Sequence, residues 1–217
     1  MNRMRFAAAV VAAAGVASIA TADNTVVFSD GPGDVSGGSF NAVTGDNGSF
    51  FTFCLEYNEN LDINGGTVYE YDITDYATFN GQGVGFQDPL DSRTAFIYQN
   101  FRDGEIRNIL GDQGLSDTQI ANAIQIAIWD IEDEAVDWSF HADYANAQAL
   151  IAAAQNAINN GDWSGLGKVR VMNIWVQGQS GTEQGARQDT LIIVPLPTTA
   201  GLAGLGLLGL TTIRRRR

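Results

Sequence analysis

The sequence contains few of the residue types that build catalytic and metal sites. Its 217 residues include one cysteine, Cys54, and one histidine, His141. One cysteine cannot close an internal disulfide, and one histidine leaves no second imidazole for a metal cluster. The chain also has neither a GxSxG nor an HExxH motif. These absences argue against a hydrolase, and we predict no metal and no other cofactor.

Basic side chains are scarce away from the two ends. Residues 23–197 hold all 25 acidic side chains and only six basic ones, a formal charge of −19. Nucleic acid is a poor partner for such a surface because its phosphates would be repelled. An acidic surface is typical of a soluble exported domain or of weak cation binding.

Residues 1–22 have the layout of a secretory signal peptide. Arg3 and Arg5 precede an apolar run over 6–19, and Ala20-Thr21-Ala22 is a small-x-small cleavage site. The alternative is an N-terminal membrane anchor. It is disfavoured because the run is shorter than the roughly 20 residues that a spanning helix needs. We expect the mature chain to begin at Asp23.

Residues 195–217 have the layout of a second targeting signal. Pro195-Leu196-Pro197 precedes an apolar, glycine-rich segment over 198–213, and four arginines follow. A helix of this segment would be about 24 Å long, which is short for a permanent span. An arginine block stays on the cytoplasmic side. The pattern favours a transient inner-membrane anchor that is later removed.

This tail resembles the PEP-CTERM sorting signal of Gram-negative bacteria. In that family the motif is usually Val-Pro-Glu-Pro, and here Leu196 stands in place of the glutamate. The resemblance implies export, processing by an exosortase-type enzyme, and delivery to the cell surface or extracellular matrix.

The mature chain reads as one α+β domain over 23–194, without repeats or long linkers. Runs rich in aromatic and β-branched residues predict strands, and apolar residues at helical spacing predict helices. The expected strands are 25–28, 39–43, 49–57, 66–74, 169–177 and 189–194, and the expected helices are 92–101, 116–133 and 142–158, with a loop at 81–88. Strands, then helices, then strands favour an antiparallel sheet or sandwich with a helical subdomain packed on it.

Two local signals fix the helix ends. Ser116 and Gln119 have the spacing of a capping box, so the second helix should begin there. Asn159-Asn160-Gly161 is a typical stop for the third helix.

Cys54 lies in the strand SFFTFCLEY, where successive side chains point to opposite faces. One face is apolar and the other is mixed: Phe51, Phe53, Leu55 and Tyr57 against Phe50, Thr52, Cys54 and Glu56. Cys54 is therefore expected beneath whatever covers the mixed face. The simplest interpretation is a small buried thiol.

Gln125 is a polar residue among the apolar side chains of the capped helix. It flanks the stripe of Ile124 and Ile128, with Trp129 one turn further on. We expect it to be partly buried, and a buried amide without partners costs a few kcal/mol. Gln125 could bond to backbone or water, or its side-chain carbonyl could be joined to a sulfur.

The two motifs together resemble the thioester domains of bacterial surface proteins. Phe53-Cys54-Leu55 matches the strand motif, and Gln125, Ala127, Ile128 and Trp129 match the helix motif, with Ile124 where the family commonly has threonine. Residues 95–101 are similar to the helix between them. The resemblance covers about residues 26–194. It implies an internal Cys54–Gln125 thioester that captures an amine, most plausibly a lysine, in a single turnover without enzymatic catalysis.

Several other residues are candidates for roles around that bond. Phe53, Tyr57 and Trp129 could shield it from water. Glu56 is a candidate for proton transfer, although an ordinary half-exposed carboxylate is the plainer interpretation. His141 favours a surface role. The acidic residues of 130–134 suggest a solvated helix face, because their spacing matches no calcium loop.

Three hypotheses follow. The first is an adhesive cell-surface or matrix protein that binds an unidentified amine-bearing ligand covalently. The second is a non-covalent matrix or structural protein of the same fold with a free Cys54, which the isoleucine at position 124 favours. The third, a hydrolase, lacks its motifs.

Overall fold

The computed structural model describes residues 24–35, 38–63, 66–79, 85–111, 113–134 and 136–194. The expected signal peptide and sorting signal, including the apolar segment 198–213, lie outside these ranges. Within them, no helix has both the length and the hydropathy required to cross a membrane.

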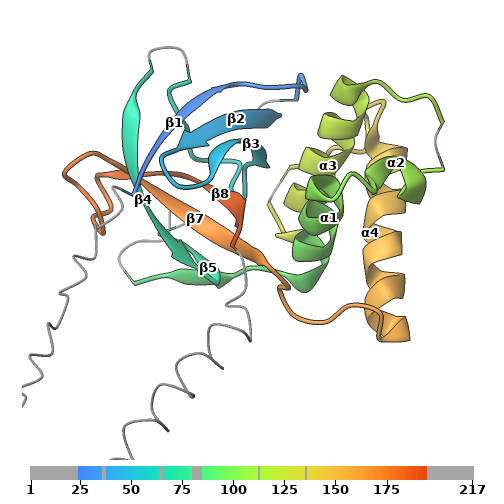
Figure 1. Ribbon diagram of the computed structural model, residues 1–217. Coiled ribbons are helices and arrows are strands. Elements are labelled where there is room, and N and C mark those ends of the chain that lie inside the picture. Colours follow the sequence, from blue (N-terminus) through green and yellow to red (C-terminus); the bar gives the residue numbers. More distant parts are fainter. Residues whose placement is uncertain are drawn as a thin grey trace, which may run out of the picture.

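A six-stranded antiparallel sheet forms one half of the molecule (Figure 1). Its order is β3 (Gly48–Phe53), β2 (Ser39–Thr44), β1 (Thr25–Asp30), β4 (Val68–Thr74), β7 (Val169–Val176) and β8 (Ala186–Ile193). Strands from both halves of the sequence thus share one sheet, because β4 pairs with β1 on one side and β7 on the other. The α+β class predicted from the sequence is confirmed.

The two edge strands of this sheet meet. Cys54 forms an isolated antiparallel bridge with Thr190, and the Leu55 N–H donates to the Asp189 carbonyl oxygen at 3.0 Å. The Thr52 hydroxyl also donates to the carbonyl oxygen of Leu191 at 2.6 Å and accepts from its N–H at 2.9 Å. These contacts satisfy backbone groups that an open edge would leave unpaired. They form a seam between β3 and β8, with Cys54 in it.

Four helices lie together beside the sheet (Figure 1). They are α1 (Ser92–Arg102), α2 (Ile106–Ile109), α3 (Asp117–Ile131) and α4 (Tyr144–Asn160). The predicted capping box starts α3: the Ser116 hydroxyl accepts from the Gln119 N–H at 3.2 Å, and Gln119 Oε1 accepts from the Ser116 N–H at 3.0 Å. Gly161, with a left-handed φ of 78°, ends α4 as predicted.

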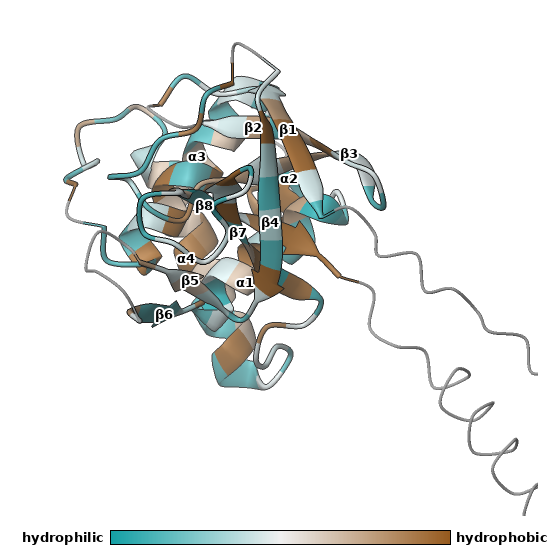
Figure 2. Ribbon diagram, turned by 90° about the vertical axis from the view of Figure 1, so that its left-hand side faces the viewer, coloured by the Kyte–Doolittle hydropathy of each residue, from teal (hydrophilic) through white to brown (hydrophobic). Residues whose placement is uncertain are grey.

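Helix α3 is buried on all sides. Every residue from Ile120 to Trp129 is buried, since the helix lies between the sheet and its neighbours α1 and α4. The predicted apolar face is therefore only part of its buried surface. By contrast, burial alternates along β4 over residues 69–72, as expected for a sheet with one covered face: Tyr69 and Tyr71 are buried, whereas Asp72 is exposed. Figure 2 shows that β4 carries both hydrophilic and hydrophobic segments.

The main differences from the sequence prediction are one early strand end and several short elements. The strand expected over 49–57 ends at Phe53, because the chain leaves β2 there and turns to the seam with β8. A short strand pair, β5 (Tyr76–Thr78) and β6 (Gln87–Pro89), was not predicted, and β6 begins within the loop expected over 81–88. The short helix α2 was not predicted.

Candidate functional site at Cys54 and Gln125

The structure brings the two motif residues together. Cys54 lies at the end of β3 with no exposed surface, and Gln125, in the middle of α3, is likewise fully buried. The Gln125 side chain was expected to be only partly buried. It is completely enclosed because α3 is covered on all sides.

The Gln125 carboxamide is clamped by the backbone of Cys54. Its Oε1 accepts from the Cys54 N–H at 3.0 Å, and its Nε2 donates to the Cys54 carbonyl oxygen at 2.9 Å. Both backbone groups lie where the strand has left the β2 ladder. The pair of bonds therefore satisfies two buried backbone groups and one buried amide at once.

This clamp also has a chemical consequence. When a nucleophile attacks the carboxamide carbon, negative charge develops on Oε1. The Cys54 N–H already points at that oxygen, so it can stabilise the charge without rearrangement, as an oxyanion-hole donor does. The amide nitrogen, which would be the leaving group, is held by the carbonyl oxygen of the same residue.

The thiol of Cys54 is protonated in this environment. Burial raises its pKa well above the ordinary value, and the nearby Glu56 carboxyl adds to the increase. A hydrogen bond with the Gln188 side chain acts in the opposite direction. Because the thiolate is the competent nucleophile, bond formation requires a group that accepts the thiol proton.

Glu56 is the acceptor that lies nearest in sequence, and it is buried, at 1 % exposure, where a half-exposed carboxylate was the plainer expectation. Its Oε2 accepts from the Asp189 N–H at 3.1 Å, and its carbonyl oxygen accepts from Gln188 Nε2. Among the described residues no group hydrogen-bonds its Oε1. Burial raises the pKa of Glu56 strongly, and the carboxyls of Asp189 and Glu59 raise it further.

Asp189 is the second carboxyl of this centre. Its Oδ1 accepts from the Ile174 N–H and its Oδ2 from the Thr78 N–H, both at 2.9 Å. Burial nevertheless raises its pKa well above the ordinary value. The backbone N–H groups orient this carboxyl, and it in turn orients Glu56 through its own N–H.

The three aromatic side chains expected to shield the site differ in exposure. Phe53 is fully buried and lies edge-on to Phe101, with ring centroids 5.1 Å apart. Trp129 is also fully buried, whereas Tyr57 is 37 % exposed. The Tyr57 ring packs edge-on against Trp129 at 5.2 Å. Phe53 and Trp129 thus present no surface to water, whereas Tyr57 does.

Both faces of the strand around Cys54 are at least partly buried. Phe51, assigned to the apolar face, is 41 % exposed, while Thr52 on the mixed face is fully buried. The mixed face is covered by α3 and β8, so polar side chains there lie inside. Sequence reasoning also missed Gln188, Asp189 and Thr190, which are 130 residues away; their one signal was an aspartate opening the apolar run DTLIIV.

Two remaining candidates lie elsewhere. His141 Nδ1 accepts from the Asp143 N–H at 3.1 Å near the start of α4, consistent with a surface role. The acidic run after Trp129 is only partly a solvated face, because Glu132 accepts from the Asp91 N–H at 3.3 Å and Glu134 from the Tyr57 N–H at 3.0 Å. In the part of the chain that the structure describes, no cluster of acidic, histidine or cysteine side chains could hold a metal ion.

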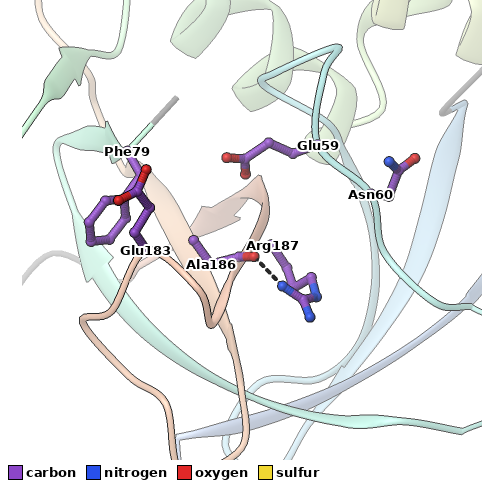
Figure 3. A pocket seen from close by; sticks show the side chains of 6 residues that line it. All are labelled: Glu59, Asn60, Phe79, Glu183, Ala186 and Arg187. Carbon is purple, nitrogen blue, oxygen red and sulfur yellow. Dashed lines mark hydrogen bonds between the residues drawn. The ribbon is translucent and has the colours of Figure 1, made fainter. Parts of the chain in front are cut away.

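A separate pocket of about 370 Å³ opens beside β8 (Figure 3). It is lined by Glu59, Asn60, Phe79, Glu183, Ala186 and Arg187. Burial raises the pKa of Glu59 to about 7, against the opposing charge of Arg187. The Arg187 guanidinium donates to the carbonyl oxygen of Ala186 at 2.5 Å. Neither Cys54 nor Gln125 lines this pocket.

Comparison with known proteins does not extend these observations. No family model matches the chain, and no curated protein or solved structure matches it either. The resemblance to thioester domains rests on the two motifs and on their placement side by side.

Proposed function

We propose that this is an exported cell-surface or matrix protein that binds a partner covalently through a thioester between Cys54 and Gln125. The observation that carries the proposal is the clamp: the backbone N–H and C=O of Cys54 hold the Gln125 carboxamide in a dry, enclosed position. An acyl group hidden in this way is protected from hydrolysis until a nucleophile is admitted.

Bond formation is balanced without any external reactant. Cys54 Sγ attacks Gln125 Cδ, the C–S bond forms, the C–N bond breaks, and ammonia leaves with the proton that the thiol loses. Glu56 is the candidate to carry that proton, because its two oxygens allow it to accept from sulfur and return a proton to nitrogen. Its free Oε1 and raised pKa support this role.

Discharge of the thioester joins the partner to the protein. A neutral amine attacks Gln125 Cδ, the C–S bond breaks, and the sulfur takes a proton to become the Cys54 thiol again. The partner is then held by an amide bond. Because the carboxamide nitrogen has been lost as ammonia, the protein acts once and is a binder without turnover.

Export and anchoring belong to the same proposal. The signal peptide of 1–22 and the PEP-CTERM-type tail of 195–217 would deliver the domain, through an exosortase-type enzyme and a transient anchor at 198–213, to the surface or matrix of a Gram-negative-type bacterium. A covalent tether suits that location, because a non-covalent contact is lost on dilution outside the cell.

A second candidate function is a non-covalent matrix protein with a free Cys54. One observation favours it: both polar atoms of the Gln125 amide are already hydrogen-bonded, so its burial does not require a bond to sulfur. Ile124, in place of the family's threonine, points the same way.

Intact mass distinguishes the two functions. We expect the purified protein to be lighter by one ammonia than its sequence requires, and to gain the mass of methylamine when treated with it. Cys54→Ala and Gln125→Ala should both show unmodified masses and no adduct. Gln148→Ala, on the exposed side of α4, is the matched control and should behave as wild type. A wild-type protein of full mass, with a thiol that alkylates after unfolding, would establish the second function.

A further inference from the structure

Four aromatic rings in contact run from helix α3 to the surface, and they are here called the aromatic ladder. It consists of Trp129, Trp138, Phe140 and Tyr57. Trp129 and Trp138 stack with centroids 5.3 Å apart and planes at 18°, and Trp138 and Phe140 stack at 6.2 Å and 29°. The Tyr57 ring is edge-on to both tryptophans, at 5.2 and 6.0 Å.

Exposure rises along the ladder. Trp129 is 0 % exposed, Trp138 8 %, Tyr57 37 % and Phe140 78 %. Phe140 is the most exposed large apolar side chain among the described residues. Single exposed apolar residues are common on proteins, whereas here two exposed rings, Tyr57 and Phe140, both pack against the buried Trp138. Aromatic residues are enriched at interaction surfaces.

The ladder is continuous with the candidate site at its inner end. Trp129 lies one helical turn after Gln125 on α3, so the two side chains are on the same face of the helix. Tyr57 follows Cys54 by three residues, and its N–H donates to Glu134. A molecule bound at the outer rings is therefore adjacent to the wall that covers the Cys54–Gln125 contact.

The surroundings of the ladder are acidic. From residue 108 to residue 167 the sequence has nine acidic side chains and no lysine or arginine. Asp137, next to Trp138, is exposed, and hydrogen bonds from the hydroxyl and N–H of Ser139 lower its pKa, so it stays ionised. Asp133 is also exposed. Aromatic faces with an anionic rim fit a cation on an apolar stem, which is the chemistry of a lysine side chain.

We propose that the aromatic ladder is the docking surface for a lysine-rich peptide segment of the partner. Lysine stems lie against Phe140 and Trp138, their ammonium groups face the carboxylates of the rim, and one lysine is thereby delivered beside the Trp129 wall. This inference rests on the proposed function for what happens to that lysine next, but docking itself does not require the thioester.

Docking can be measured without the bond. The Cys54→Ala protein is titrated with an acetylated, amidated peptide that contains four lysines spaced by glycines, and tryptophan emission is recorded. We expect saturable binding that weakens as salt is added and is lost when norleucine replaces the lysines. Phe140→Ala should weaken binding by about fivefold, the size of a cation–π contact at a partly exposed site. Phe51→Ala removes another exposed phenylalanine, on β3, and should leave binding unchanged.

A second arm separates this inference from the proposed function. With wild-type protein, the rate of adduct formation is compared for the same peptide and for methylamine, which is too small to need docking. We expect Phe140→Ala to lower the ratio of the two rates by about fivefold. Methylamine adducts with an unchanged ratio would overturn the docking surface and leave the thioester intact. Peptide binding through Phe140 without any adduct would overturn the thioester and leave the docking surface.

Equal peptide affinity in the Cys54→Ala protein with and without Phe140→Ala would also overturn the inference. Because Phe140 is exposed, its substitution does not endanger folding, so the comparison is made between two folded proteins. Tyr57→Phe keeps the aromatic ring, so its affinity for the peptide should equal that of the Cys54→Ala protein with no change in the ladder.

Discussion

Two buried polar centres lie side by side at the seam between β3 and β8, and they behave oppositely toward protons. Gln125 is neutral and both of its polar atoms are bonded to the Cys54 backbone. Glu56 and Asp189 are ionisable; three of their four oxygens accept backbone N–H groups, and burial still raises both pKa values. Hydrogen bonds alone thus do not make the stability of a buried group independent of pH. The pH dependence is set by whether the group can carry a charge.

The contrast assigns different tasks to neighbouring residues. A neutral amide with both polar atoms bonded can be buried at any pH. This suits an acyl group that must not react until a partner nucleophile arrives. A buried carboxyl with a raised pKa holds a proton more tightly than an exposed carboxyl does, which makes its carboxylate a stronger proton acceptor. Cys54, whose backbone holds the neutral amide of Gln125, is two residues from Glu56, the carboxyl with the raised pKa.

The largest effect is expected when the neutral centre, Gln125, is replaced by a residue that can ionise. The change is made in the Cys54→Ala protein, where the carboxamide of Gln125 stays intact. In Gln125→Glu the new carboxylate can still accept from the backbone N–H of residue 54, but it must be protonated to donate to the carbonyl oxygen of that residue. Its folded pKa would be raised by burial, so stability is retained below roughly pH 4.3 and lost as pH rises. We expect a loss of about 3 kcal/mol at pH 7.5 and much less at pH 4, measured by urea unfolding.

Gln125→Met is the matched control for that change. It removes both hydrogen bonds but introduces no charge, so its cost of about 2 kcal/mol should be the same at pH 4 and pH 7.5. Equal pH profiles for the glutamate and methionine variants would contradict the account of the clamp.

The converse change removes the titratable group from the second centre. In the wild type the pKa of Glu56 is higher in the folded than in the unfolded protein. The contribution of Glu56 to folding stability is therefore complete below roughly pH 4.3 and is lost as the pH rises through the pKa of the folded state. Glu56→Gln can still accept from the Asp189 N–H. We expect the free energy of unfolding of the variant to be about 2 kcal/mol above that of wild type at pH 8 and equal to it at pH 4.

The same variant tests proton transfer. If Glu56 carries the thiol proton, Glu56→Gln should accumulate protein of full, unbonded mass although it is more stable. Stability and bond formation would then move in opposite directions, which a purely structural role cannot produce. Complete bond formation in the variant would remove Glu56 from the chemistry.

A weaker version of the buried carboxyl occurs at Glu132, which lines the same small cavity as Glu56. Burial raises its pKa to about 7, and its Oε1 accepts from the N–H of Asp91, the N-cap of α1. Glu132→Gln keeps that bond. We expect a gain of about 1 kcal/mol at pH 8 that disappears below roughly pH 4.5, because the wild-type carboxyl is then protonated in both states. Thermal unfolding at the two pH values measures it.

Much of the fold was predictable because its signals are local. The capping box at Ser116 and the stop at Gly161 are set by residues a few positions apart, and both were located correctly. The seam was not predictable, since Cys54 meets Thr190 across 136 residues and no local pattern encodes that closure. For the same reason Glu56 was expected to be half-exposed, although β8 covers it.

The residues of the candidate site likewise differ in whether the sequence contains a signal for them. Cys54 and Gln125 were paired by a motif resemblance, which carries long-range information that strand alternation does not. Asp189 had no motif to identify it, and an aspartate at the start of an apolar strand normally suggests a strand end exposed to water. Its burial follows from two backbone N–H groups, of Thr78 and Ile174, contributed by elements that the sequence places far apart.

The smallest effect is expected where a short polar contact lies in water. Arg107 and Asp117 form an ion pair at 2.7 Å, shorter than the 2.9 and 3.0 Å bonds between Gln125 and Cys54, but their side chains are 42 % and 81 % exposed. Asp117→Asn should cost about 0.5 kcal/mol or less in low salt and nothing in 1 M salt, because exposed charges are screened and already hydrated. Urea unfolding at the two salt concentrations measures the difference. A cost near that of Gln125→Met would mean that distance, rather than burial, sets the worth of a polar contact in this protein, and the distinction between the seam and the surface would fail.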